Sequence, residues 1–73
     1  MDGFRFDSEN NLWTSYGKGI ACYSYSGEQI GYIKMPELVS NIDFGGTEGT
    51  TLFITASTSL YMANLNIKGA KFK

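Results

Sequence analysis

Two stretches of the chain, GFRFDSENNLWTSYGKGIACY at residues 3–23 and NIDFGGTEGTTLFITASTSLYM at residues 41–62, are two copies of one pattern. The copies align at an offset of 38 residues, which becomes 40 after a two-residue insertion in the second copy. The matched apolar pairs are Phe6 with Phe44, Leu12 with Leu52, Trp13 with Phe53, Ile20 with Leu60 and Cys22 with Met62. The chain therefore repeats one structural unit.

The whole chain has a strand-like character. Short runs rich in Tyr, Phe, Ile and Thr alternate with turn-forming clusters of Gly, Asn and Ser, and no stretch has helical periodicity. Because the connections are short, successive strands are expected to pair antiparallel. The expected strands are residues 4–7, 12–16, 20–25, 29–35, 41–44, 52–56 and 59–67.

A repeat of this length with four short strands per unit is typical of a β-propeller blade. A sandwich or small barrel also fits the strand count, but neither requires the two halves to resemble each other. We predict an all-β fold of about two antiparallel blades, the second lacking its outer strand. The expected division is a four-stranded blade at 3–35, a linker at 36–40, an incomplete three-stranded blade at 41–67 and a basic tail at 68–73.

Composition narrows the possible chemistry. The 73 residues are 42% apolar and 18% charged, which is typical of one small globular domain. The chain has no histidine, so Ser-His-Asp and Cys-His catalysis and histidine-containing zinc sites are excluded. Cys22 is the single cysteine, so the chain is not a disulfide scaffold.

Charge and hydropathy bear on location and partners. The net charge is -1, all the acids precede residue 49, and Lys68, Lys71 and Lys73 make the C-terminus basic. Three lysines fall short of the broad basic face that binds nucleic acid, so we expect a solvated terminus. No apolar run approaches a membrane span and no secretory signal is visible. We therefore expect a soluble cytoplasmic chain without a nucleic-acid or membrane partner.

Two segments carry a family resemblance. DGFRFDSENNLWTS at residues 2–15 and GEQIGYIKMPELVSNIDFGGTEGTTLFITASTSLY at residues 27–61 resemble the C-terminal part of the gluconolactonase, regucalcin and luciferin-regenerating-enzyme-like family. The match runs from Asp2 to about Gly69. It implies a six-bladed β-propeller whose channel holds one divalent metal, often calcium, and which hydrolyses lactones of sugar acids. This chain would supply roughly the last two blades, the final one closed by a strand from elsewhere.

The resemblance implies one metal ligand in this chain. The family holds its metal with a Glu, an Asn and the Asp of a Pro-Asp-Gly motif, and only that Asp has a counterpart, Asp2, which follows Met1 instead of Pro. Calcium takes about 6 to 8 oxygen ligands, so one carboxylate is insufficient. Asp2 is therefore either one third of a metal site completed by other segments, or a solvated terminal acid.

Three further features have competing interpretations. Ser40 is the repeat equivalent of Asp2, and with Asn41 it lines the channel rim or forms a turn pair that opens a strand. Residues 7–11 resemble a calcium loop, but Leu12 replaces the required Gly and Lys18 the required Glu, so we expect a hairpin turn. For the aromatic residues, packing between blades is favoured over carbohydrate stacking.

Two functions follow from these observations. In the first, the chain is the C-terminal piece of a metal-dependent lactone hydrolase, inactive as a monomer because most of the site lies outside it, with no catalytic base identified. In the second, the open edge of the last strand leads copies to assemble into a ring with a structural or binding role. Three copies would complete six blades and bring three Asp2 carboxylates around one channel.

Overall fold

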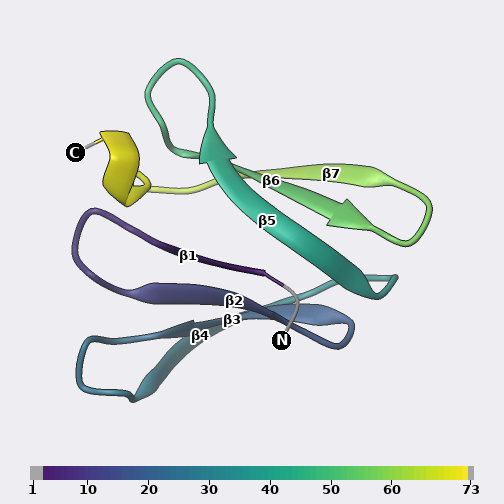
Figure 1. Cartoon of the computed structure of the whole chain (residues 1–73), viewed down its shortest axis with the longest axis horizontal. Coiled ribbons are helices and arrows are strands. Elements are labelled where there is room, and N and C mark those ends of the chain that lie inside the picture. Colours follow the sequence, from purple (N-terminus) through teal and green to yellow (C-terminus); the bar gives the residue numbers. More distant parts are fainter. Residues whose placement is uncertain (1–2, 73) are drawn as a thin grey trace.

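The computed structural model describes residues 3–72 and consists of two antiparallel sheets (Figure 1). The first sheet has the order β1-β2-β3-β4 and the second the order β5-β6-β7, which confirms the predicted all-β fold with four and three strands. The elements are β1 (Phe4–Phe6), β2 (Leu12–Tyr16), β3 (Gly19–Tyr23), β4 (Gln29–Lys34), β5 (Val39–Gly45), β6 (Thr51–Ala56), β7 (Leu60–Asn64) and the 3₁₀ turn η1 (Ala70–Phe72).

The strand register reproduces the sequence repeat residue by residue. Phe6 lies opposite Leu12 in the first sheet, as Phe44 lies opposite Leu52 in the second. Likewise, the aromatic residue of the second strand pairs with the sulfur residue of the third in both sheets. These pairs are Trp13 with Cys22 and Phe53 with Met62. The two-residue insertion therefore falls in the turn after β5, and the sheets are copies of one supersecondary unit.

The core lies between the two sheets. Its buried members are Ile20, Met35, Val39, Ile42, Phe44, Leu52 and Ile54. Trp13 of β2 packs edge-on against Phe44 of β5, with ring centroids 6.1 Å apart and an interplanar angle of 86°. Each fully buried aliphatic or aromatic side chain contributes about 1.5–3 kcal/mol. This face-to-face contact is what holds the two sheets in a fixed relation.

The opposite faces of both sheets are apolar too. Residues that pair across antiparallel strands share a face, so Phe6 and Tyr32 lie on the outward face of the first sheet. Leu60 and Met62 lie on the outward face of the second sheet. All four side chains are about half exposed or more. Each sheet thus has one face buried against its neighbour and one apolar face that is open.

The connection between the sheets is shorter than the linker predicted at residues 36–40. β5 begins at Val39, because this side chain is buried in the core and its N–H donates to the Gly17 carbonyl at 3.0 Å. The last strand is also shorter than predicted. β7 ends at Asn64, where its regular pairing with β6 stops, although the Leu65 N–H still donates at 2.9 Å to the carbonyl of Thr50, the residue opposite it in the register.

Glu37 ties this connection to the turn between β6 and β7. Its carboxylate accepts hydrogen bonds from the Tyr61 hydroxyl at 2.6 Å and from the Thr58 hydroxyl and N–H at 2.7 and 2.9 Å. These bonds, that of Tyr61 above all, lower the pKa of Glu37 from 4.5 to about 2. This partly buried acid therefore acts as a fixed acceptor that ties the connection between the sheets to the β6–β7 turn.

The C-terminal segment packs across both sheets. The Ser8 N–H donates to the Lys68 carbonyl at 2.7 Å, and the Gly69 N–H donates to the Gly49 carbonyl at 3.1 Å. A side chain at Gly69 would collide with the ring of Phe44. The sequence predicted a solvated basic terminus. The Lys68 and Lys71 side chains are exposed, as predicted, while the backbone of this segment satisfies groups of the β1–β2 and β5–β6 turns.

Candidate functional site

The first strands of the two sheets, β1 and β5, lie side by side (Figure 1). Gly3 precedes β1, and Ser40 and Asn41 lie near the start of β5. The structure brings Gly3 against the Asn41 side chain, so the two strand starts meet. Asp2, the predicted metal ligand, lies outside the described residues.

Gly3 is held firmly by β2. Its N–H donates to the Ser15 hydroxyl at 3.1 Å, and its carbonyl accepts from the Ser15 N–H at 3.0 Å. A Cβ at this position would overlap the side-chain amide of Asn41 and lie 3.1 Å from the Asn41 Cα, so glycine lets β1 and β5 approach closely without displacing Asn41. The backbone that immediately follows Asp2 is therefore fixed by contacts with both sheets.

Ser40 and Asn41 sit at an irregularity in β5. The register shifts between Val39 and Asn41, which sets Ser40 apart from the regular ladder. The Ser40 hydroxyl donates to the Thr55 carbonyl at 3.0 Å, and the Asn41 Oδ1 accepts from the Ile42 N–H at 2.9 Å. Both side chains are exposed, and Asn41 borders a small pocket of about 90 Å³. Their role as a channel rim stays a prediction.

Asp7 is a buried acid whose importance the sequence did not reveal. Its Oδ1 accepts hydrogen bonds from the N–H groups of Glu9 and Asn11, at 2.8 and 2.9 Å. Its Oδ2 accepts from the Asn11 amide and the Trp13 indole, both at 2.9 Å. Burial raises the pKa of Asp7, but these four bonds, led by that of Trp13, outweigh burial and lower it overall. The predicted hairpin turn at residues 7–11 is thus organised by its first residue, whose oxygens are already occupied.

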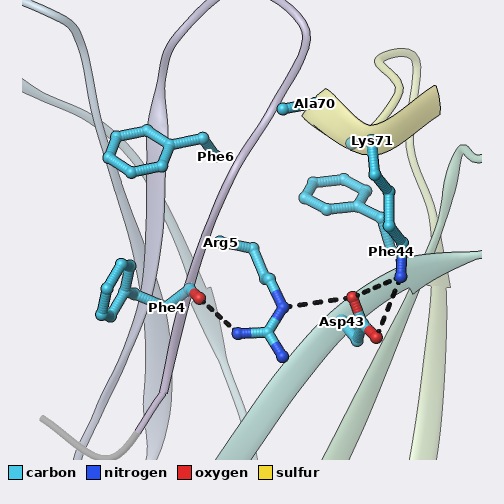
Figure 2. A pocket seen from close by; sticks show the side chains of 8 residues that line it. Phe4, Arg5, Phe6, Asp43, Phe44, Ala70 and Lys71 are labelled. Atoms are coloured by element: carbon cyan, nitrogen blue, oxygen red, sulfur yellow. Dashed lines mark hydrogen bonds and ion pairs between the residues drawn. The ribbon is translucent and has the colours of Figure 1, made fainter. Parts of the chain in front are cut away.

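A second cluster of charges joins three separate parts of the chain (Figure 2). Asp43 of β5 accepts from Arg5 Nε at 3.2 Å and from Lys71 Nζ at 2.9 Å. Partial burial raises the pKa of Asp43, but Lys71 and Arg5 together lower it overall. The cluster borders a pocket of about 330 Å³ whose apolar wall includes Phe4, Phe6 and Phe44. Neither the pairing nor the pocket has a signal in the sequence, because the partners lie 28 and 38 residues apart.

The described part of the chain does not by itself fit a divalent metal. Residues 3–72 contain no group of three His, Cys, Asp or Glu side chains that could hold one. The two buried candidates are also unsuitable. Asp7 has both oxygens bonded within its turn, and burial together with the Asp7 charge raises the pKa of Cys22 to about 11. Without a metal the thiol therefore stays protonated at neutral pH and is a poor nucleophile.

Comparison with known proteins identifies the family to which this architecture belongs. Residues 1–58 match the family model of the SMP-30/gluconolactonase/LRE-like region. The chain belongs to this family. A crystal structure of a protein assigned as a gluconolactonase superposes with a TM-score of 0.90 at 37% sequence identity. No curated protein gives a significant match.

The chain corresponds to only part of that crystal structure. The superposition takes in 93% of this chain but 23% of the gluconolactonase chain. The two sheets are therefore a small part of a gluconolactonase-like propeller, as the sequence predicted. Within residues 3–72 no helix is long and apolar enough to cross a membrane. The cytoplasmic location expected from the sequence stays a prediction.

Proposed function

We propose that this chain supplies two adjacent blades of a hydrolase that opens lactones of sugar acids with the help of a divalent metal. Membership of the gluconolactonase-like family supports the reaction class, and the superposition on an assigned gluconolactonase supports the blade arrangement. The observation that carries the proposal is the meeting of β1 and β5 at Gly3 and Asn41. In a propeller the first strand of each blade surrounds the channel, so these strand starts would border the channel mouth.

In this proposal Asp2 is the part of a metal site that the chain contributes. A divalent metal, calcium being the ion that the family resemblance implies, polarises the lactone carbonyl when it is bound in such an enzyme. Residues 3–72 supply too few oxygen donors for calcium, so the remaining ligands would come from other blades. The chain's own contribution is to hold the Gly3 backbone against Ser15 and Asn41.

The proposal also includes a substrate-binding role for two exposed polar side chains of β5. The Asn41 amide and the Ser40 hydroxyl lie on the side where β1 and β5 begin. Amide and hydroxyl groups can donate to and accept from the hydroxyls of a sugar acid. We assign them to the channel rim, where they would orient the lactone without taking part in bond cleavage.

A chimeric propeller tests this proposal. This chain would replace the matching segment of the crystallised gluconolactonase, and aldonolactone hydrolysis would be followed by titration of the acid released. We expect metal-dependent turnover from the chimera and a loss of at least about 100-fold on Asp2→Asn, because second-shell changes alone cost about 10–100-fold. Glu28→Gln, which removes an exposed acid from the β3–β4 turn, is the matched control and should keep the activity.

Calcium binding gives the chimera a second readout. Titration calorimetry should show one site in the chimera and a weakened site in Asp2→Asn. A chimera that folds, binds calcium and loses nothing on Asp2→Asn would contradict the role assigned to Asp2. A folded chimera that hydrolyses no lactone, while the parent enzyme does, would contradict the proposed function.

A further inference from the structure

We infer that the two outward faces of this chain are complementary to each other, so that copies of the chain dock head to tail. The occupant of each face is therefore a second copy of the same chain. The inference goes beyond the proposed function, because it requires neither a metal nor a lactone. It rests on the strand register, which relates the contact already present inside the chain to the two faces that are open.

The contact between the two sheets of one chain is the model for the contact proposed between copies. From the first sheet, Trp13 and Ile20 pack against Phe44, Leu52 and Ile54 of the second sheet. These five residues cover each other and form most of the core. The contact is thus made by the second and third strands of one sheet against the first and second strands of the next.

The strand register shows which face of the second sheet is equivalent to the face that the first sheet contributes to this contact. It is the outward face. The equivalents of Trp13 and Ile20 are Phe53 and Leu60, and Met62 is the equivalent of the buried Cys22. Leu60 is 63% exposed and Met62 is 68% exposed, whereas Ile20 and Cys22 are buried. The second sheet therefore presents to solvent the face that the first sheet buries.

The second half of the contact is found on the outward face of the first sheet. The equivalents of Phe44, Leu52 and Ile54 are Phe6, Leu12 and Thr14, so an identical Phe and an identical Leu are retained. Phe6 is 49% exposed, although its equivalent Phe44 is buried. The two open faces thus repeat the two halves of an interface that this sequence already forms. This match within one chain favours a second copy as the occupant over an unrelated protein.

The strand edges favour the same arrangement. Within residues 3–72, β7 pairs with β6 and has no second neighbour, whereas its equivalent β3 pairs with both β2 and β4. The backbone groups along the open side of β7 lie beside Leu60 and Met62, and an edge of this kind pairs readily with another chain. Because the two docking faces differ, the contact is heterologous and propagates until the rotation between copies closes a ring. Three copies would provide six sheets, the number that the family resemblance implies.

Two single variants, used separately and then mixed, test this inference by light scattering coupled to gel filtration. Met62→Lys blocks the outward face of the second sheet, and Phe6→Glu blocks that of the first. Both side chains lie outside the core between the sheets, so circular dichroism should show the wild-type fold. We expect the wild type to form a trimer at high micromolar concentration, three times the 8.1 kDa of one chain, and each variant to remain a monomer.

The mixture identifies the geometry of the contact. Each variant keeps the face that the other has lost, so equal amounts should form a dimer of one copy of each and nothing larger. Tyr32→Glu, on the same face as Phe6, repeats the test if Phe6→Glu does not fold. Tyr25→Lys is the control, because this highly exposed aromatic lies in the β3–β4 turn away from both faces and should not change the assembly. A wild type that stays monomeric, variants that still assemble, or a folded mixture that forms no dimer would each overturn the inference.

Discussion

The role of Asp7 could be predicted only in part from the sequence. The run at residues 7–11 predicts a hairpin turn, because it lacks the Gly and Glu that a calcium loop requires. The structure adds that Asp7 is almost fully buried and bonded to the Trp13 indole. Whether such an acid binds a cation or organises a turn depends on side-chain direction, which sequence spacing does not determine.

Replacing Asp7 with Asn should destabilise the fold. Either the amide nitrogen would face the indole N–H of Trp13 and the amide of Asn11, or it would face the two backbone N–H groups. A buried donor without an acceptor costs about 1–3 kcal/mol, so we expect a loss of about 2 kcal/mol in the free energy of unfolding. Urea unfolding followed by the fluorescence of Trp13, the single tryptophan, measures this directly.

Glu9→Gln is the control for this measurement. Glu9 lies in the same turn with an exposed side chain, so its replacement should change the stability by less than about 0.5 kcal/mol. If Asp7→Asn proved as mild as Glu9→Gln, the turn would not depend on the carboxylate. The expectation for Asp43→Asn is also small, about 1 kcal/mol or less, because its ion pairs with Arg5 and Lys71 are half exposed.

At the scale of elements, the repeat was the most informative signal. Apolar identity at Phe6 and Phe44 and at Leu12 and Leu52 was enough to predict two like units, and the strand register agrees with that alignment. The ends of elements were harder to predict. Val39 extends β5 because its burial depends on the packing of the other sheet, and β7 is shorter than the predicted run because its regular pairing with β6 stops at Asn64.

The hydrogen bonds to Glu37 should make the stability of the chain depend on pH in the acidic range. Its pKa in the folded chain is about 2, below the ordinary value of 4.5, because Tyr61 and Thr58 donate to the carboxylate. A lowered pKa means that the stabilisation is complete above pH 4.5 and is lost as the pH falls through about 2. We therefore expect Glu37→Gln to lower the urea midpoint at neutral pH, with a difference from wild type that shrinks toward pH 2.

The difference in urea midpoint between wild type and Glu37→Gln reports on the Glu37 carboxylate alone. Asp7 and Asp43 also have lowered pKa values, but they are present in both proteins and cancel in the difference. Glu28→Gln, which changes an exposed acid of the β3–β4 turn, serves as the matched control. A difference between Glu37→Gln and wild type that stayed constant from neutral pH to pH 2 would show that titration of Glu37 does not contribute.

At the scale of the whole molecule, a chain of 73 residues is small for a stable domain, and its structure shows why. A chain of this size buries only about 60% of its unfolded surface. Here one core lies between two sheets, and the outward faces leave Phe6, Tyr32, Leu60 and Met62 about half exposed or more. The molecule therefore has the surface of a ring segment, with an apolar face at each end for the next segment.

The two-blade architecture could be predicted from the sequence, but the packing of the C-terminal segment against both sheets could not. The repeat and the family resemblance were sufficient for the number of strands and the blade architecture. The C-terminal residues were expected to be solvated, since three lysines within six residues are usually exposed. The Lys68 and Lys71 side chains are indeed exposed, but the backbone of this segment also bridges the turns of both sheets at Ser8 and Gly49, a pairing between positions far apart in the sequence.

In the proposed function, activity requires more of the ring than one copy of this chain provides. The most direct test is aldonolactone hydrolysis by the Met62→Lys chain, which we expect to be monomeric, with and without added calcium. Residues 3–72 hold no group of three metal-ligating side chains, so the rate should equal that of buffer in both conditions. Calcium-dependent turnover by a chain shown to be monomeric in the same sample would mean that one copy is sufficient for activity.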